Sequence, residues 1–329
     1  MKDYAPAAVV GTLAFMALAI LHRQPYLADV LILVCMYGAL SVSWNLAAGF
    51  AGLLSLGHSL FFGIGAYAVA TLGTVFGLNP WYCMAAGIVL SLLAALVIGS
   101  LCFRYNVRGY YFGIATLAFS EIAFFLVSAT LVFGRSDGLM IPYRSNGWTY
   151  LQFNEKWPYG VLIILLLLAI MLASASAMRG RSGSYWRAIR DNEEAADALG
   201  VPVMRYKIFA FLLSAAFTSL CGSFFAVYVS FVDPRSVLGV EISLQVLVFS
   251  IIGGMRKQWG PVLGAALLVP VGEFLRISTS GSITGLSTIL YAVLLMVLSL
   301  TLPQGVGGWL ASRWGILRAA RQSIKDRQP

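Results

Sequence analysis

The stretch between Asp29 and Arg104 contains no Lys, Arg, Asp or Glu. A water-soluble domain does not tolerate such a run, because charged residues make up about 25% of an ordinary globular chain. Here they make up only 11% of the 329 residues, whereas hydrophobic residues make up 60%. The stretch has room for about three membrane-spanning helices of roughly 20 residues each. The sequence therefore predicts an integral membrane protein of the all-α class.

Further apolar runs on both sides of this stretch bring the expected number of spans to about ten in a polytopic transmembrane helical bundle. The first run lacks the small-residue cleavage site of a signal peptide, so we expect it to remain in the mature chain. The whole chain, 1–329, forms a single transmembrane domain in this interpretation. Its predicted spans, of which 6–21, 60–75 and 242–253 are the shortest, are residues 6–21, 27–46, 60–75, 81–103, 109–133, 158–178, 208–232, 242–253, 261–275 and 284–302.

The net charge of +9 comes from 22 Lys and Arg residues against 13 Asp and Glu residues. The basic residues stand beside apolar runs without interleaved aromatic residues, which favours membrane orientation over nucleic-acid binding. With the polar segment 179–207 in the cytoplasm, sixteen of the 22 basic residues lie on the cytoplasmic side. This orientation predicts two cytoplasmic termini, a basic cytoplasmic tail at 303–329 and a long external loop at 134–157.

A short helix is predicted within the polar segment 179–207, which lies between two long apolar runs. Asp191 and Glu194 have the spacing of a capping box, in which a short side chain caps the first turn and the later acid reaches back. Gly200 stands where a left-handed C-terminal cap belongs, and Pro202 follows where a helix does not easily continue. We expect a helix of roughly two turns over residues 192–199.

One face of this helix is expected to be small and apolar, because Ala195, Ala196 and Leu199 share it. Such a face allows another surface to approach closely. A solvated loop with a locally stable turn is the alternative for a generic polar linker.

The run Glu194-Ala195-Ala196 followed by Gly200 resembles the EAA signature of ABC-importer permeases, whose short cytoplasmic helix docks into a cleft of the ATPase subunit. The longer stretch RAIRDNEEAADALGVPVMRYKIFAFLLSAAFTSLCG is similar to the larger permease subunits of the branched-chain (hydrophobic) amino-acid importer family. The resemblance implies that ATPase coupling involves Arg187, Arg190, Glu194, Ala195, Ala196, Leu199 and Gly200.

Two glycine-rich bends interrupt the apolar pattern, at residues 45–59 and 253–264. Irregular backbone survives at membrane depth only where protein or a water-filled path satisfies its polar groups. Close helix packing through small residues is the alternative for the first bend, and the Gly260-x-x-x-Gly264 pattern equally suits a packing face in the second. The first bend also resembles the G-x-x-G-x-x-S-L-G-H-x-x-F-x-x-x-G-A-Y segment of the family, with every position matching from Gly49 to Tyr67. We predict a substrate path lined by Asn45, Ser55, Gly57, His58, Thr116, Glu121 and Gly254.

Glu121 stands near the middle of an apolar run, where an ionisable group usually faces the bundle interior. It either locks a helix interface through a hydrogen bond or shapes the substrate path. Glu273 lies three residues before Arg276, so a local ion pair is the simpler interpretation of that carboxylate.

The sequence has no G-x-x-x-x-G-K-[ST] phosphate loop, so ATP is expected on partner subunits and no cofactor on this chain. Its four cysteines are isolated and its two histidines form no H-E-x-x-H motif, which argues against a metal site, a disulfide framework and an enzyme. An ion-coupled secondary transporter is the rival from another class, because broken helices also occur there.

The prediction is therefore the permease subunit of an ABC importer in the cell inner membrane, working by ATP-driven alternating access. The resemblance implies two ABC ATPase subunits, a second and homologous permease subunit, and a periplasmic substrate-binding protein, all acting at the lipid bilayer. Branched-chain amino acids are the default substrate of the family, and urea, short amides or other amino acids are the alternatives.

Overall fold

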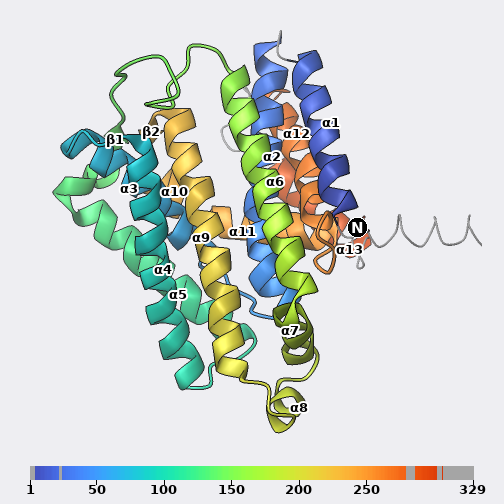
Figure 1. Ribbon diagram of the computed structural model, residues 1–329. Helices are drawn as coiled ribbons and strands as arrows, with labels where there is room; N and C mark the ends of the chain where they lie inside the picture. The colour runs from blue at the N-terminus through green and yellow to red at the C-terminus, as the bar shows by residue number, and fades with distance from the viewer. Residues whose placement is uncertain (1–3, 22–23, 279–285, 302–305, 307–329) are drawn as a thin grey trace, which may run out of the picture.

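Long helices dominate the computed structural model, which describes residues 4–21, 24–278, 286–301 and 306. They run side by side between the two ends of the molecule (Figure 1). In chain order, the helices and strands are α1 (Ala5–Leu21), α2 (Pro25–Asn45) with its π-helical extension η1 (Leu46–Phe50), α3 (His58–Val75), α4 (Pro80–Arg104), α5 (Tyr110–Ala129), η2 (Leu131–Phe133), η3 (Arg135–Asp137), β1 (Leu139–Met140), α6 (Trp157–Arg179), α7 (Arg181–Asp191), α8 (Glu193–Ala198), α9 (Val203–Val229), β2 (Phe231–Val232), α10 (Pro234–Leu238), α11 (Val240–Gly253), α12 (Gly260–Ser278) and α13 (Leu286–Thr301).

Eight helical segments of the described chain are long and apolar enough to cross a membrane. They confirm the all-α polytopic bundle. The 17-residue α1 and the 16-residue α13 coincide with the first and last predicted spans, but both are shorter than the roughly 20 residues that a crossing needs. The span count of ten therefore stays a prediction, and the predicted basic tail 303–329 lies outside the described residues, except for Val306.

The starts of several spanning helices follow directly from the sequence. Pro25, Pro80 and Pro158 occupy the first turn of α2, α4 and α6, where the missing N–H needs no partner inside the helix. Ahead of α4, the Asn79 side chain accepts a hydrogen bond of 3.1 Å from the backbone N–H of Trp81. These local signals are why the observed starts of α2, α4 and α6 lie close to the predicted ones.

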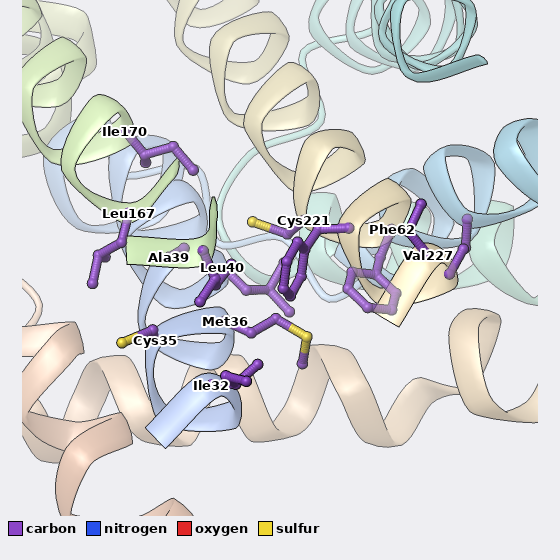
Figure 2. Close-up of a cluster of buried hydrophobic side chains, with 14 of the residues drawn as sticks. Ile32, Cys35, Met36, Ala39, Leu40, Phe62, Leu167, Ile170, Cys221 and Val227 are labelled. Atoms are coloured by element: carbon purple, nitrogen blue, oxygen red, sulfur yellow. The ribbon is translucent and has the colours of Figure 1, made fainter. Parts of the chain in front are cut away.

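The bundle is held together mainly by α9 against α3 and α4, and by α2 against α12 and α6. A buried hydrophobic cluster joins these helices and contributes most of the apolar burial (Figure 2). The four cysteines are free and buried, as expected of apolar fillers. Labelled members of the cluster are Ile32, Cys35, Met36, Ala39, Leu40, Phe62, Leu167, Ile170, Cys221 and Val227.

The predicted external loop 134–157 and the helices α7 and α8 lie at opposite ends of the molecule (Figure 1). The loop is tied down by strand β1, which pairs antiparallel with β2 after α9. Arg144 anchors it further, since its guanidinium donates hydrogen bonds of 2.6 and 2.8 Å to the carbonyls of Gly77 and Gly73. The opposite placement of the two polar segments agrees with the predicted topology.

The second glycine-rich bend is a site of close packing between α11 and α12. A Cβ on Gly264 would lie 1.9 Å from the carbonyl oxygen of Phe249, and one on Gly253 would lie 1.9 Å from that of Gly260. Only glycine permits this approach of two helix backbones, so the packing interpretation of Gly260-x-x-x-Gly264 is confirmed.

Candidate functional site

The predicted short helix exists as α8, with a cap on each side. The side chain of Asn192 caps its N-terminus by accepting a hydrogen bond of 3.0 Å from the N–H of Ala195. Gly200 has a φ of +81°, a left-handed conformation that glycine adopts at little cost. The helix spans six residues, Glu193–Ala198, so it is shorter than the two turns predicted.

The predicted capping box is wrong by one position. Asp191 is the last residue of α7, and its carboxylate accepts hydrogen bonds from Arg190 instead of capping α8. Glu194 pairs with Arg108 rather than reaching back to the cap. Asn192 and Asp191 are both good caps, and the sequence pattern does not decide between them because it cannot show where α7 ends.

Helix α7 itself was missed, because the charges of Arg181–Asp191 were interpreted as a polar linker. Trp186 and Ile189 are buried on one side of α7, and this helical spacing of apolar residues was the available signal. The indole N–H of Trp186 donates a hydrogen bond of 2.9 Å to the carbonyl of Tyr206 at the start of α9. Helix α7 therefore fixes α8 relative to a spanning helix.

The expected apolar face of α8 is only partly exposed. Ala195 is exposed and Leu199 is 85% exposed, but Ala196 is only 2% exposed. The Ala196 side chain packs against Ile189 and Val203 of the same chain, because α8 folds back onto α7 and the start of α9. The placement of Ala196 on a docking face is wrong, whereas Ala195 and Leu199 remain available to a partner.

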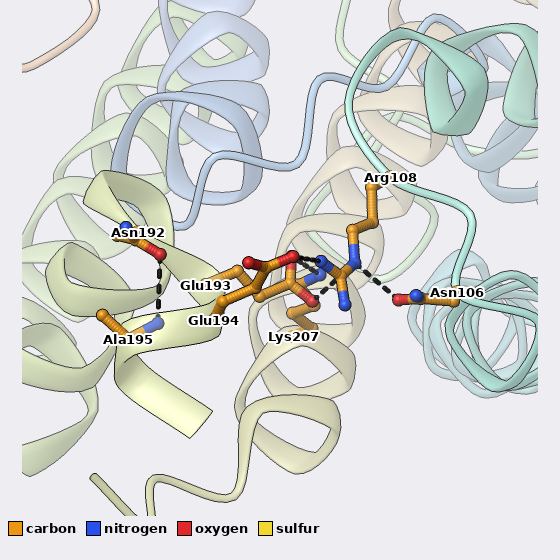
Figure 3. Close-up of polar contacts among 7 residues, drawn as sticks. All are labelled: Asn106, Arg108, Asn192, Glu193, Glu194, Ala195 and Lys207. Atoms are coloured by element: carbon orange, nitrogen blue, oxygen red, sulfur yellow. Dashed lines mark hydrogen bonds and ion pairs between the residues drawn. The ribbon is translucent and has the colours of Figure 1, made fainter. Parts of the chain in front are cut away.

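An ion-pair cluster connects α8 to the spanning helix α9 and to the segment before α5 (Figure 3). Glu193 pairs with Lys207 of α9 at 2.5 Å and with Arg108, which precedes α5, at 3.4 Å. Arg108 also reaches Glu194 at 3.2 Å and Asn106 at 2.5 Å. The Lys207 side chain is only 6% exposed, so its charge depends on Glu193 for compensation.

Sequence reasoning missed this cluster. Arg108 and Lys207 are far apart in the chain, and no local spacing links them. The only available signal was that both flank apolar runs on the same predicted side of the membrane.

The two predicted coupling arginines behave differently. Arg187 is exposed and makes a contact of 3.4 Å with the hydroxyl of Ser184. Arg190 is turned inward, and its side chain is only 20% exposed. Its guanidinium donates a hydrogen bond of 3.1 Å to the carbonyl of Gly49 in the first glycine-rich bend.

The first glycine-rich bend contains a non-helical segment, residues 51–57, between the π-helical end of α2 and the start of α3. At its far end, His58 lies beside Ser214 of α9, at a contact of 2.8 Å. Ser214 is eleven residues beyond Val203, so the segment reaches roughly 16 Å into the bundle from the start of α9. Irregular backbone inside the bundle, as predicted from the sequence, is therefore present.

Protein atoms satisfy much of this irregular backbone. The indole N–H of Trp44 donates a hydrogen bond of 2.8 Å to the carbonyl of Ser55, and the N–H of Leu56 donates one of 3.1 Å to the hydroxyl of Thr116. A Cβ on Gly57 would lie 2.1 Å from the carbonyl oxygen of Thr116, so α5 lies directly against the segment.

A buried polar network surrounds the start of α3. The hydroxyl of Ser55 and the Nδ1 atom of His58 are 3.0 Å apart. Beside them, the Ser59 hydroxyl contacts the hydroxyls of Ser120 and Ser243, at 2.8 and 3.1 Å. The structure thus brings four predicted path residues, Ser55, Gly57, His58 and Thr116, to one place between α3, α5, α9 and α11.

The other predicted path residues have distinct surroundings. Asn45 is buried, and its side-chain amide donates a hydrogen bond of 3.4 Å to the carbonyl of Lys257, which joins the two glycine-rich bends. Gly254 terminates α11 with a φ of +107°. Glu121 is half-buried in α5 beside Ser120. The predicted pair of Glu273 and Arg276 is present at 2.7 Å.

No group of three or more His, Cys, Asp or Glu side chains within the described ranges is positioned to hold a metal ion. The chemistry at hand is that of helix termini, hydroxyls and ion pairs.

The sequence model of one protein family, the branched-chain amino acid transport system permease component, matches residues 26–302. The chain belongs to this family. The match includes α8, the ion-pair cluster and both glycine-rich bends. The permease is therefore a multi-pass inner-membrane component of an ABC transporter, a class of protein that works with ATPase subunits.

Named relatives support this assignment. The permease is 32% identical to the high-affinity branched-chain amino acid permease protein LivM of Salmonella typhimurium over 84% of its length and 69% of the relative. It has the same identity and coverage with LivM of Escherichia coli. The ribose import permease RbsC of Escherichia coli is 26% identical over 65% of the permease and 66% of the relative. No solved structure gives a significant match.

Proposed function

We propose that the chain is the permease subunit of an ATP-driven importer that moves branched-chain amino acids into the cytoplasm. The observation that carries the proposal is the connection between α8 and the membrane helices in a chain similar to LivM proteins. Glu193 ties α8 to Lys207 and Arg108, so a partner that binds α8 can act on α9 and on the start of α5.

The complete transporter contains this subunit, a second and homologous permease, two ABC ATPases and a periplasmic substrate-binding protein. ATP binds to the ATPase subunits, and the permease has no nucleotide site or cofactor of its own. Helices α7 and α8 face the cytoplasm together with both termini, and the loop 134–157 faces the binding protein. Closure of the ATPases pushes α8, and the spanning helices respond by alternating access.

Substrate passes beside the buried network around His58, in a conformation more open than the one described. The side chains of Ser55 and Thr116 are packed against protein atoms in this structure. Helix movement is needed to expose them, which suits a permease seen with its path closed. Glu121 follows Ser120, a member of this network. Its proposed role is to stabilise the packing of α5 against the neighbouring helices.

Reconstitution of the complete transporter tests the proposal. ATP hydrolysis should rise when binding protein loaded with leucine is added, and binding protein loaded with ribose should give no rise. Stimulation by ribose would instead support the second candidate function, sugar import, which the similarity to RbsC raises. No stimulation by leucine, isoleucine or valine would overturn the substrate assignment.

A further inference from the structure

Arg190 joins the end of α7 to the end of α2. Its Nη1 atom donates the hydrogen bond of 3.1 Å to the Gly49 carbonyl, while Nε and Nη2 lie 3.0 and 2.9 Å from the carboxylate oxygen Oδ1 of Asp191. Asp191 therefore fixes the plane of the guanidinium, and the third nitrogen, Nη1, points at the backbone of the first glycine-rich bend.

The acceptor on this bend is suited to a cation. Gly49 belongs to the last turn of the helix formed by α2 and η1, where carbonyl groups lack partners within the helix and carry partial negative charge. Gly52, with a φ of +74°, lies directly against the stem of Arg190. A Cβ built on Gly52 would be 3.1 to 3.3 Å from the Cα, Cβ and Cγ atoms of Arg190.

On its own side, Arg190 projects from a packed unit. Trp186 is fully buried and bonded to the start of α9, and Ile189 packs with Ala196 of α8 and Val203 of α9. Because these contacts join α7, α8 and the start of α9, α8 cannot shift without carrying the base of Arg190 with it.

On the other side, the bend leads to the buried polar network. The Ser55 carbonyl is bonded to Trp44, and the Ser55 hydroxyl contacts His58. A displacement at Gly49 and Gly52 is therefore transmitted along residues 51–57 to the start of α3. Within the described part of the chain, the side chain of Arg187, which is equally basic and only three residues earlier, contacts Ser184 rather than this segment.

We infer that Arg190 is a positioning residue that transmits movement of α8 to the non-helical segment 51–57 and so couples ATP hydrolysis to opening of the path. The inference rests on the proposed function. It assigns Arg190 to contacts inside the permease, whereas the exposed residues Ala195 and Leu199 are left to contact the ATPase.

The test is the amount of leucine imported per ATP hydrolysed by the complete transporter in proteoliposomes. Arg190→Gln removes the charged donor and keeps a polar side chain. Loss of a hydrogen bond made by a charged group lowers an equilibrium constant by about tenfold or more. We therefore expect the ratio of leucine imported to ATP hydrolysed to fall about tenfold. Arg205→Gln is the matched control, because Arg205 is an exposed arginine in the first turn of α9, outside the link.

Retention of the ATPase subunits on gel filtration shows that Arg190→Gln has folded and assembled. Arg190→Lys should recover part of the ratio, since an ammonium group donates to Gly49 but does not match the two-donor contact with Asp191. Hydrogen exchange of the amides of residues 51–57 gives a second readout. In the wild type it should differ between the nucleotide-free and vanadate-trapped states, and in Arg190→Gln this difference should disappear.

Two results would overturn the inference alone. The first is an unchanged ratio of leucine to ATP in Arg190→Gln, whether or not hydrolysis and import both fall. The second is a retained nucleotide-dependent change in the hydrogen exchange of residues 51–57. Absence of ATP-driven import by the wild-type complex would instead overturn the proposed function, and the inference with it.

Discussion

Replacing Leu199 by alanine separates docking from folding, because the side chain of Leu199 is 85% exposed at the C-cap of α8. Full burial of a leucine side chain contributes about 1.5–3 kcal/mol of stabilisation. The fold of the permease gains little of this free energy from Leu199, because the side chain is almost fully exposed. Since alanine retains part of the apolar surface, Leu199→Ala should weaken binding of the ATPase by about 1–2 kcal/mol, or roughly fivefold to thirtyfold in Kd.

The assay is a titration of purified ATPase subunit against permease complex in nanodiscs. The matched control is Leu165→Ala, which truncates an exposed leucine of α6 inside a spanning helix and should leave the Kd unchanged. Stability of the isolated permease should change by less than about 0.5 kcal/mol in Leu199→Ala, as is usual for exposed positions. A wild-type Kd for Leu199→Ala would refute the assignment of α8 as the docking element.

Three further predictions concern the cap, the ion-pair cluster and the topology. Gly200→Val should cost about 1–2 kcal/mol locally, because the backbone at position 200 is left-handed, and should abolish uptake at normal expression. Gly200→Asn should retain uptake, and equal uptake by both variants would show that the cap is not needed. Glu193→Gln should leave Lys207 without its carboxylate partner and lower the free energy of unfolding by about 2 kcal/mol in thermal unfolding. The double variant Glu193→Gln/Lys207→Met should recover this loss, and an unchanged stability in the single variant would contradict the charge argument. In a variant lacking the native cysteines, Asn146→Cys should react with an impermeant thiol reagent added to spheroplasts and Ser184→Cys should not, and the reverse pattern would invert the topology.

The spanning helices could be predicted from the sequence because a bilayer imposes a length and a polarity on each of them. Prolines at the starts of α2, α4 and α6 fixed their N-terminal boundaries closely. The start of α9 was placed at residue 208 instead of Val203, because Arg205 and Lys207 interrupt the apolar pattern. Lys207 is buried there only because a glutamate from α8 pairs with it, and no single-sequence pattern shows such a partner.

The coupling segment was predicted in outline and not in its packing. Gly200 and the short helix were recognisable, since local backbone preferences determine both. The burial of Ala196 and the inward direction of Arg190 depend on how α8 folds back against α7 and α9. Tertiary contacts of this kind decide which side of a six-residue helix faces a partner, and helical periodicity over so few residues does not.

The first glycine-rich bend was predicted as an irregular, pore-lining break, and close packing was left as an open alternative for the second. The structure shows close packing at Gly264 and Gly57 and a buried polar network around His58. The gathering of Ser55, His58 and Thr116 was anticipated from their polarity within apolar runs. Ser214, which contacts His58, and Ser243, which contacts Ser59, were missed, because isolated serines are common in membrane helices and carry no signal of their own.

Leucine uptake with all ion gradients collapsed tests the central claim most directly. Proteoliposomes holding the permease, its homologous partner and the two ATPases are loaded with ATP, treated with ionophores and given external binding protein charged with radiolabelled leucine. The account predicts leucine accumulation that requires internal ATP and is unaffected by the ionophores. Accumulation that needs an ion gradient and proceeds without ATP would contradict it and identify the chain as an ion-coupled transporter.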